Sequence, residues 1–97
     1  MYDYTGQIVQ ATAGREKDGL FCVIGVDHEK VRLLLADGKR RSVRKPKEKK
    51  LGHVRHLTDS QTMFDHPTIR KLTQGEPVTD RELRRALAAF KEGIKLG

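Results

Sequence analysis

Short runs of apolar residues alternate with polar ones over the first half of the chain, a pattern that is typical of β-strands. Ile8 and Val9 lie between two glutamines, and the segment 20–26 is a dense apolar run. Leu33 and Leu35 fall on one face of a strand over 31–36, with Val31 on the same face. With weaker runs at 40–45 and 51–57, the pattern predicts five strands, the first over 5–12.

A charged turn bracketed by glycines connects the first two predicted strands. Its sequence is Ala13-Gly14-Arg15-Glu16-Lys17-Asp18-Gly19. Because glycine reaches positive φ without steric cost, we expect Gly14 and Gly19 to reverse the chain at both ends of the charged segment. Arg15 and Lys17 would then lie at the tip.

The other predicted connections are polar and short. Asp27–Lys30 is expected to join the second and third strands, and Asp37-Gly38 is a strong hairpin signal after the third. Pro46 lacks a backbone donor, so we expect it to end the fourth strand and leave 47–50 as a loop.

Five short strands joined by tight turns indicate a closed or half-closed barrel or a small sandwich, with an open meander as the alternative. Closure is favoured because it removes unpaired strand edges. A chain of 97 residues with 36% hydrophobic residues has room for one small domain with a modest core. We expect the single cysteine, Cys22, to be a buried residue of that core.

The periodicity changes after residue 57. A capping box, Thr58-x-x-Gln61, predicts one helical turn through Met63 and Phe64, and Asp65-His66-Pro67 predicts the start of a short helix over 68–73. A longer helix is predicted over 79–95, after the capping box Thr79-x-x-Glu82. Its apolar stripe, which should pack on the sheet or on another chain, comprises Leu83, Ala86, Leu87, Phe90 and Ile94.

The first turn and its flanks resemble the KOW motif of RNA-binding ribosomal proteins and transcription elongation factors. The resemblance rests on Gly6, Val9, Gly14, Lys17 and Gly19, in the spacing G-x-x-V-x-x-x-x-G-x-x-K-x-G. The chain is similar to KOW-containing large-subunit ribosomal proteins of archaea and eukaryotes and to their small bacterial relatives. The resemblance implies an SH3-like β-barrel, which we expect over residues 1–57. We expect the helical extension over 58–97 to pack on this barrel, because the apolar stripe of its long helix needs a partner surface. It also implies that the turn contacts RNA or protein.

Positive charge is concentrated in one segment. The chain carries a formal net charge of +7, whereas residues 39–56 alone carry nine Lys or Arg against one acid, or +8. Such a local patch favours phosphate binding, which is driven by counterion release, over a solvated basic loop. Together with the turn, the predicted RNA-binding residues are Arg15, Lys17, Lys39, Arg40, Arg41, Arg44, Lys45, Lys47, Lys49, Lys50 and Arg55.

The remaining residue inventory narrows the function. Aromatic side chains number five, too few for recognition by base stacking, so structured RNA is the better expectation. His53 and His56 lack neighbouring ligands at metal spacing, so neither a metal nor another cofactor is expected. The sequence shows no recognisable set of catalytic residues and no phosphate-binding loop, so we do not expect the protein to be an enzyme.

Two functions of different classes are therefore compatible with the sequence. The first is a non-catalytic module that binds structured RNA, with ribosomal RNA and ribosomal proteins as the partners that the resemblance implies. The second is a protein-interaction module of the translation or transcription machinery. Apolar runs are too short to span a bilayer and the first residues do not resemble a signal peptide, so we expect a cytoplasmic protein without a membrane partner.

Overall fold

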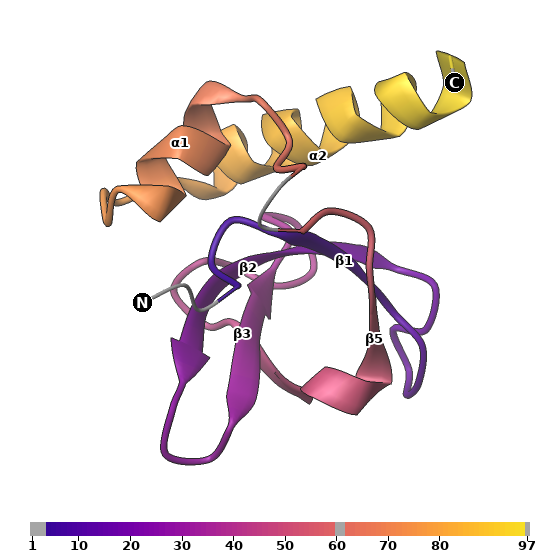
Figure 1. The fold of residues 1–97 in the computed structure, drawn as a ribbon, viewed down its shortest axis with the longest axis vertical. Coiled ribbons are helices and arrows are strands. Elements are labelled where there is room, and N and C mark those ends of the chain that lie inside the picture. The colour runs from indigo at the N-terminus through magenta and orange to yellow at the C-terminus, as the bar shows by residue number, and fades with distance from the viewer. Residues whose placement is uncertain (1–3, 60–61, 97) are drawn as a thin grey trace.

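The described residues form a five-stranded antiparallel sheet, a short 3₁₀ helix and two C-terminal α-helices. The computed structural model describes residues 4–59 and 62–96, the last three by their backbone only. The strands are ordered β4-β3-β2-β1-β5, and both helices lie over one face of the sheet (Figure 1). In chain order the elements are β1 (Ile8–Ala11), β2 (Leu20–Asp27), β3 (Arg32–Ala36), β4 (Lys47–Lys50), the 3₁₀ helix η1 (Leu51–His53), β5 (Val54–His56), α1 (Pro67–Thr73) and α2 (Asp80–Leu96).

The sheet is strongly curled, as its connections require. Its two edge strands, β4 and β5, are joined only by the three residues of η1. A flat sheet would hold these edges about 19 Å apart, whereas four Cα steps reach at most about 15 Å. The two edges must therefore approach each other at the η1 end.

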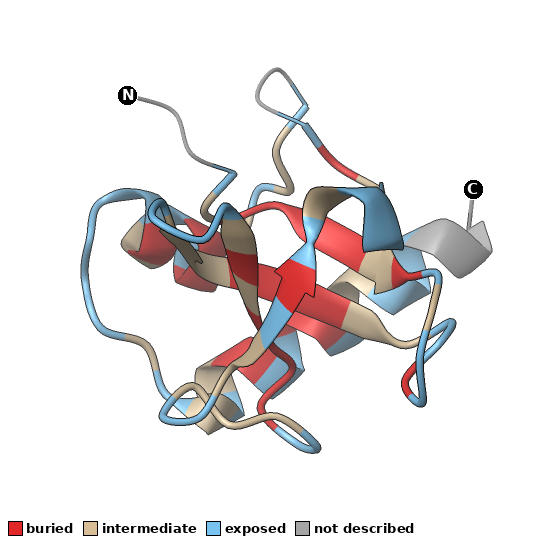
Figure 2. Ribbon diagram, turned by 90° about the horizontal axis from the view of Figure 1, so that it is seen from below, coloured by how far each residue is buried: buried red, intermediate tan, exposed pale blue. Residues whose placement is uncertain are grey.

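Apolar side chains form a separate cluster on each face of the sheet. Successive side chains of a strand point to opposite faces, so Phe21 and Val23 lie in one cluster and Cys22 lies in the other. The inner cluster comprises Val9, Ala11, Phe21, Val23, Leu33, Leu35 and Val54. The outer cluster joins the sheet to the helices and comprises Cys22, Ala36, Ile69, Leu72 and Leu83. The buried residues follow the strands, and the exposed ones gather in the loops (Figure 2).

The prediction that Cys22 is a small buried core residue is confirmed. Its side chain is fully buried, and burial raises the pKa of its thiol to about 12. The thiol is therefore protonated at neutral pH.

The position of the fourth strand was predicted wrongly. Residues 40–45 form bends and turns, whereas 47–50, which was expected to be a loop, is β4 and pairs with β3 in the register Leu35↔Lys47 to Arg32↔Lys50. Pro46 thus precedes the strand instead of ending it. Backbone pairing at a sheet edge does not require apolar side chains, and lysine is a common edge residue, so apolar periodicity could not reveal β4.

Two smaller predictions were also wrong. Val31 was placed on the inner face of the third strand, but it lies in the β2–β3 turn with φ 55° and 58% exposure. The helical turn predicted from the first capping box is not formed by residues 62–66. The Thr58 hydroxyl instead accepts a hydrogen bond from the Ile8 N–H, and Gln61 lies outside the described residues.

The start signals of both helices are confirmed. Pro67 opens α1, and the Nδ1 of His66 accepts a hydrogen bond from the Thr68 N–H. At α2, the Glu82 N–H donates to the Thr79 hydroxyl, and the Thr79 N–H donates to the Glu82 carboxylate, which is the predicted capping box.

The predicted stripe of α2 faces the sheet and α1. Leu83, Ala86 and Leu87 are buried. Phe90 is half-buried, and its ring meets that of Phe64 edge to face with the centroids 5.3 Å apart. The side chain of Ile94 lies outside the described part of the chain.

Candidate nucleic-acid interface

The β1–β2 turn, residues 12–19, projects from the sheet and is held by its own backbone hydrogen bonds. The Asp18 N–H donates to the Ala11 carbonyl, and the Lys17 N–H donates to the Gly14 carbonyl. Gly14 has φ +85°, as expected, but the second positive φ of the turn belongs to Asp18 and not to Gly19. A Cβ on Gly19 would lie 3.0 Å from the carbonyl oxygen of Glu16 and 2.6 Å from a guanidinium nitrogen of Arg40, so a side chain at this position would displace the Arg40 side chain and crowd the turn backbone.

Glu16 joins this turn to the basic segment. Its carboxylate accepts hydrogen bonds from the Arg41 guanidinium and from the Lys47 ammonium, the latter at 3.1 Å. The Arg41 guanidinium, followed by the Lys47 ammonium, lowers the pKa of the Glu16 carboxyl from 4.5 to about 2, against an opposing effect of burial. The side chain of Glu16 is only 10% exposed, so this ion pair is part of the structure and does not belong to a mobile surface.

Lys49 is a second cation that the fold itself uses. It is buried, and its Nζ donates a hydrogen bond of 2.9 Å to the carbonyl oxygen of Ala13. Gly14 lies against the same ammonium, since a Cβ there would be 3.0 Å from it. Lys49 thus fixes the start of the turn and does not display its charge.

The basic segment 37–45 is held from within by Asp37. This buried carboxylate accepts hydrogen bonds of 2.9 Å from the N–H groups of Lys39 and Arg41. It also lies 3.5 Å from Nε of Arg40. One acid therefore fixes a bend whose side chains are mostly cations.

Helix α2 holds the same segment from the other side. Asp80 accepts hydrogen bonds of 2.8 Å from the Val43 N–H and from the Ser42 hydroxyl, and these two donors lower the pKa of its carboxyl. Arg84 donates to the carbonyl of Gly38. Gly38, with φ +76°, packs so closely that a Cβ there would overlap the carbonyl oxygen of Asp80.

The structure brings part of the predicted site together around the turn. Arg15 and Lys17 are exposed at its tip, and Lys39 and Arg40 are exposed on the neighbouring segment. Arg40 lies over the ring of Phe21, with its guanidinium carbon 5.7 Å from the ring centroid. We call these four residues, which all lie at or beside the turn, the turn-side cations.

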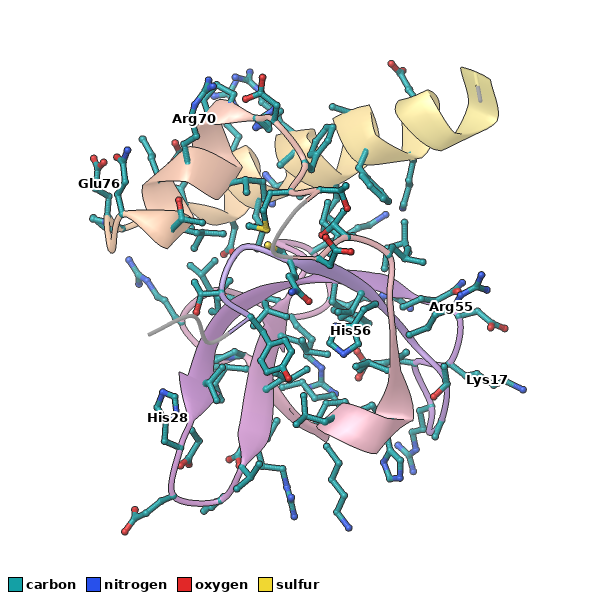
Figure 3. All side chains as sticks on the ribbon, in the orientation of Figure 1. Lys17, His28, Arg55, His56, Arg70 and Glu76 are labelled. Carbon is teal, nitrogen blue, oxygen red and sulfur yellow. The ribbon has the colours of Figure 1, made fainter. Side chains whose placement is uncertain are left out.

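Arg55 lies beside the same turn on β5. It pairs with Gln10, whose side-chain amide donates to the carbonyl of Asp18. Lys17 and Arg55 project from the same side of the domain, while His28 lies on the other side (Figure 3).

The remaining predicted residues are spread more widely. Arg44 and Lys45 are exposed at the end of the basic segment, and Arg44 lies beside the start of α2. Lys50 pairs with Arg32 near the β2–β3 turn, at the opposite end of β4 from Lys47. Arg41, Lys47 and Lys49 contact Glu16 or the turn backbone, as described above. The predicted patch is therefore a mixture of displayed cations and cations that hold the fold together.

Sequence reasoning missed the acids that organise the site, which are Glu16, Asp37 and Asp80. A signal was available for two of them, because Glu16 lies at the centre of the turn and only Gly38 separates Asp37 from a run of three cations. Asp80 gave no signal, since its partners in the basic segment lie 37 and 38 residues away in sequence.

The five residues that carry the resemblance to the KOW motif lie in different parts of the structure. Val9 is fully buried in the inner cluster. Gly6 has φ +93°, and a Cβ there would lie 2.9 Å from the side chains of Met63 and Thr73. Gly14, Lys17 and Gly19 shape or occupy the turn, so the spacing of the motif corresponds to one strand and one turn.

His53 and His56, which were weighed as metal ligands from the sequence, lie in η1 and in β5. Among residues 4–59 and 62–96, no cluster of three His, Cys, Asp or Glu has metal-binding geometry. His56 shares a hydrogen bond of 2.8 Å with the Gln7 side chain.

Within residues 4–59 and 62–96, neither α-helix has the length and apolar character needed to cross a bilayer. No protein-family model and no curated protein sequence matches the chain.

Proposed function

We propose that this protein is a non-catalytic, cytoplasmic module that binds structured RNA, ribosomal RNA or an RNA associated with the ribosome, through phosphate contacts. The observation that supports this function best is the arrangement of the turn-side cations. They lie on two segments that Glu16, Asp37 and Asp80 fasten to each other and to α2. Their backbone positions are therefore set before any partner arrives.

This arrangement suits phosphate binding for a physical reason. Binding a polyanion orders flexible cationic side chains, and each ordered segment costs conformational entropy. A backbone that is already fixed avoids part of that cost. Glu16 does not repel a phosphate strongly, because Arg41 and Lys47 compensate its charge.

The proposed architecture is the SH3-like barrel of KOW-domain proteins. Two features support it: the edges of the sheet approach each other at η1, and the motif glycines lie where a turn or a close contact needs them. The proposed family relationship rests on these features and on the motif.

The surface favours RNA over a protein-interaction module. Among the described residues, the large hydrophobic side chains that are exposed are Tyr4, before β1, and Val31, in the β2–β3 turn. Protein-docking surfaces usually present larger contiguous apolar patches. Dense positive charge on fixed backbone is instead what a phosphate chain requires.

The test is RNA binding by fluorescence anisotropy over a series of salt concentrations, with a ribosomal RNA helix as the probe. The variant replaces Arg15, Lys17 and Lys39 by Gln, three exposed side chains. Losing three phosphate contacts should weaken binding and lower the log–log salt slope by roughly 2 to 3.

The control removes the same charge elsewhere, by replacing Lys30, Arg70 and Arg85 with Gln. These residues are exposed on the β2–β3 turn, α1 and α2. Arg70 projects from α1, well away from Lys17 (Figure 3). Equal effects of the two triple variants, or no binding by the wild type, would refute the proposed interface.

A further inference from the structure

A groove of about 500 Å³ lies between the basic segment and α2. Its described lining includes four cations, Lys39 and Arg40 from the segment and Arg84 and Lys91 from the helix. Leu20 and Leu87 supply apolar surface between these two walls. Sequence reasoning placed Lys39 and Arg40 at the interface but assigned no role to Arg84 or Lys91.

The charge of the groove is strongly positive. Among the lining residues that the structure describes, the one acid is Asp37, which is occupied by the backbone N–H groups of its own bend and by Arg40. The four cations outnumber this one carboxylate, whose hydrogen-bond partners are already in place. An anion is therefore needed to balance the positive charge of the groove. The chemistry of the walls thus selects a ligand with negative charge and some apolar surface.

Two of the four cations are held in place by contacts. Arg84 donates a hydrogen bond to the Gly38 carbonyl, and Arg40 lies over Phe21 while its Nε faces Asp37. Guanidinium groups fixed in this way present their remaining donors in defined directions, which suits phosphate oxygens.

We propose that this groove receives one unpaired nucleotide of the bound RNA. Its phosphate contacts Lys39, Arg84 and Lys91, and its sugar and base lie against Leu20 and Leu87. The volume lies within the range of small-molecule sites, and proteins commonly read RNA through nucleotides that leave the helix, with Arg planes as stacking partners. This inference rests on the proposed RNA-binding function, and it adds α2 to the interface and a preference for a bulge.

The test compares two RNA hairpins, one fully paired and one with a single-nucleotide bulge, by anisotropy titration. The groove variants are Lys91→Gln and Ala88→Glu, both at exposed lining positions. The matched control is Arg85→Gln, an exposed α2 cation that does not line the groove. Thermal melting establishes that each variant is folded.

The wild type should bind the bulged hairpin more tightly, and each groove variant should lose roughly threefold to tenfold affinity for it. The paired hairpin and the Arg85→Gln control should change little. Equal losses for both hairpins would overturn the nucleotide assignment. Unchanged RNA affinity with loss of binding to a Glu-rich peptide would assign the groove to a protein segment.

These outcomes are separable from the proposed function itself. If a turn variant that replaces only Arg15 and Lys17, and so leaves the groove lining intact, weakens RNA binding while the groove variants do not, the interface stands and the groove proposal fails. If neither set of variants affects binding, both fail.

Discussion

The basic run contains two neighbouring pieces, residues 39–45 and 47–50, that share a composition and differ in structure. The first is an irregular segment held by Asp37 and Asp80, and Arg84 binds the carbonyl of Gly38 just before it. The second is a regular edge strand, β4, in which Lys49 is buried. Backbone pairing and acidic anchors, and not apolar periodicity, decide which piece becomes the strand.

The two pieces also use their charge differently. In β4, Lys47 and Lys49 donate to Glu16 and to the Ala13 carbonyl. In 39–45, Arg41 also binds Glu16, but Lys39, Arg40, Arg44 and Lys45 are exposed, whereas Lys50 is the one exposed cation of β4. A count of cations in the sequence therefore overstates the surface that a phosphate chain could contact.

The largest expected effect comes from separating the irregular segment from α2. Gly38→Ala places a Cβ against the Asp80 carbonyl at a residue with φ +76°. We expect a loss of about 2–4 kcal/mol in the free energy of unfolding, from overlap and backbone strain together. Urea denaturation measures it.

The control for this prediction lies just after β4. A Cβ added at Gly52 would meet no atom within 4 Å, and the φ of this residue is not positive. Gly52→Ala should change stability by no more than about 0.5 kcal/mol. Comparable losses in both variants would mean that Gly38 is not under special steric constraint.

The next effect comes from the anchor between the turn and β4. Glu16→Gln removes the carboxylate that holds Arg41 and Lys47, and we expect a loss of about 1–2 kcal/mol at pH 7. The matched change Glu48→Gln breaks a looser, exposed pair with Lys30 at 3.8 Å and should cost less than about 0.5 kcal/mol.

The Glu16 contribution should depend on pH in a defined direction. Because folding lowers its pKa from 4.5 to about 2, the stabilisation is present above pH 4.5 and is lost as pH falls toward 2. The stability difference between wild type and Glu16→Gln should therefore shrink over this interval. A difference that stays constant from about pH 6 to about pH 2.5 would contradict the assigned role.

A smaller effect is expected at Lys49. Lys49→Gln shortens a buried side chain and removes its hydrogen bond to Ala13, which should cost about 1 kcal/mol. The exposed Lys39→Gln should leave the melting temperature unchanged. If both melt alike, burial of Lys49 does not contribute to stability.

Most regular elements could be predicted because their signals are local. The apolar pair Ile8-Val9 and the dense apolar run over 20–26 indicated the first two strands, and Thr79 with Glu82 marked the start of α2. The position of β4 was missed because its pairing with β3 leaves no apolar pattern in Lys47–Lys50. Local sequence cannot reveal such an edge strand.

The candidate site was predictable in composition but not in arrangement. The cations of 39–50 stand out in the sequence, whereas the contacts that decide which of them are exposed and which hold the fold together are long-range. Arg41 reaches Glu16 across 25 residues, and Arg84 reaches Gly38 across 46. Only the fold shows which cations these contacts engage.

The most direct test of the account compares two double variants with equal loss of charge. One replaces the displayed Lys39 and Lys45 with Gln, and the other replaces the structural Lys47 and Lys49. Affinity for a ribosomal RNA helix is measured against salt at a temperature where both variants are folded. The account predicts that the first keeps the wild-type melting temperature and lowers the salt slope by roughly 1.4 to 1.8. The second should melt earlier with a smaller change of slope, whereas equal slopes in the two variants would contradict the division into displayed and structural cations.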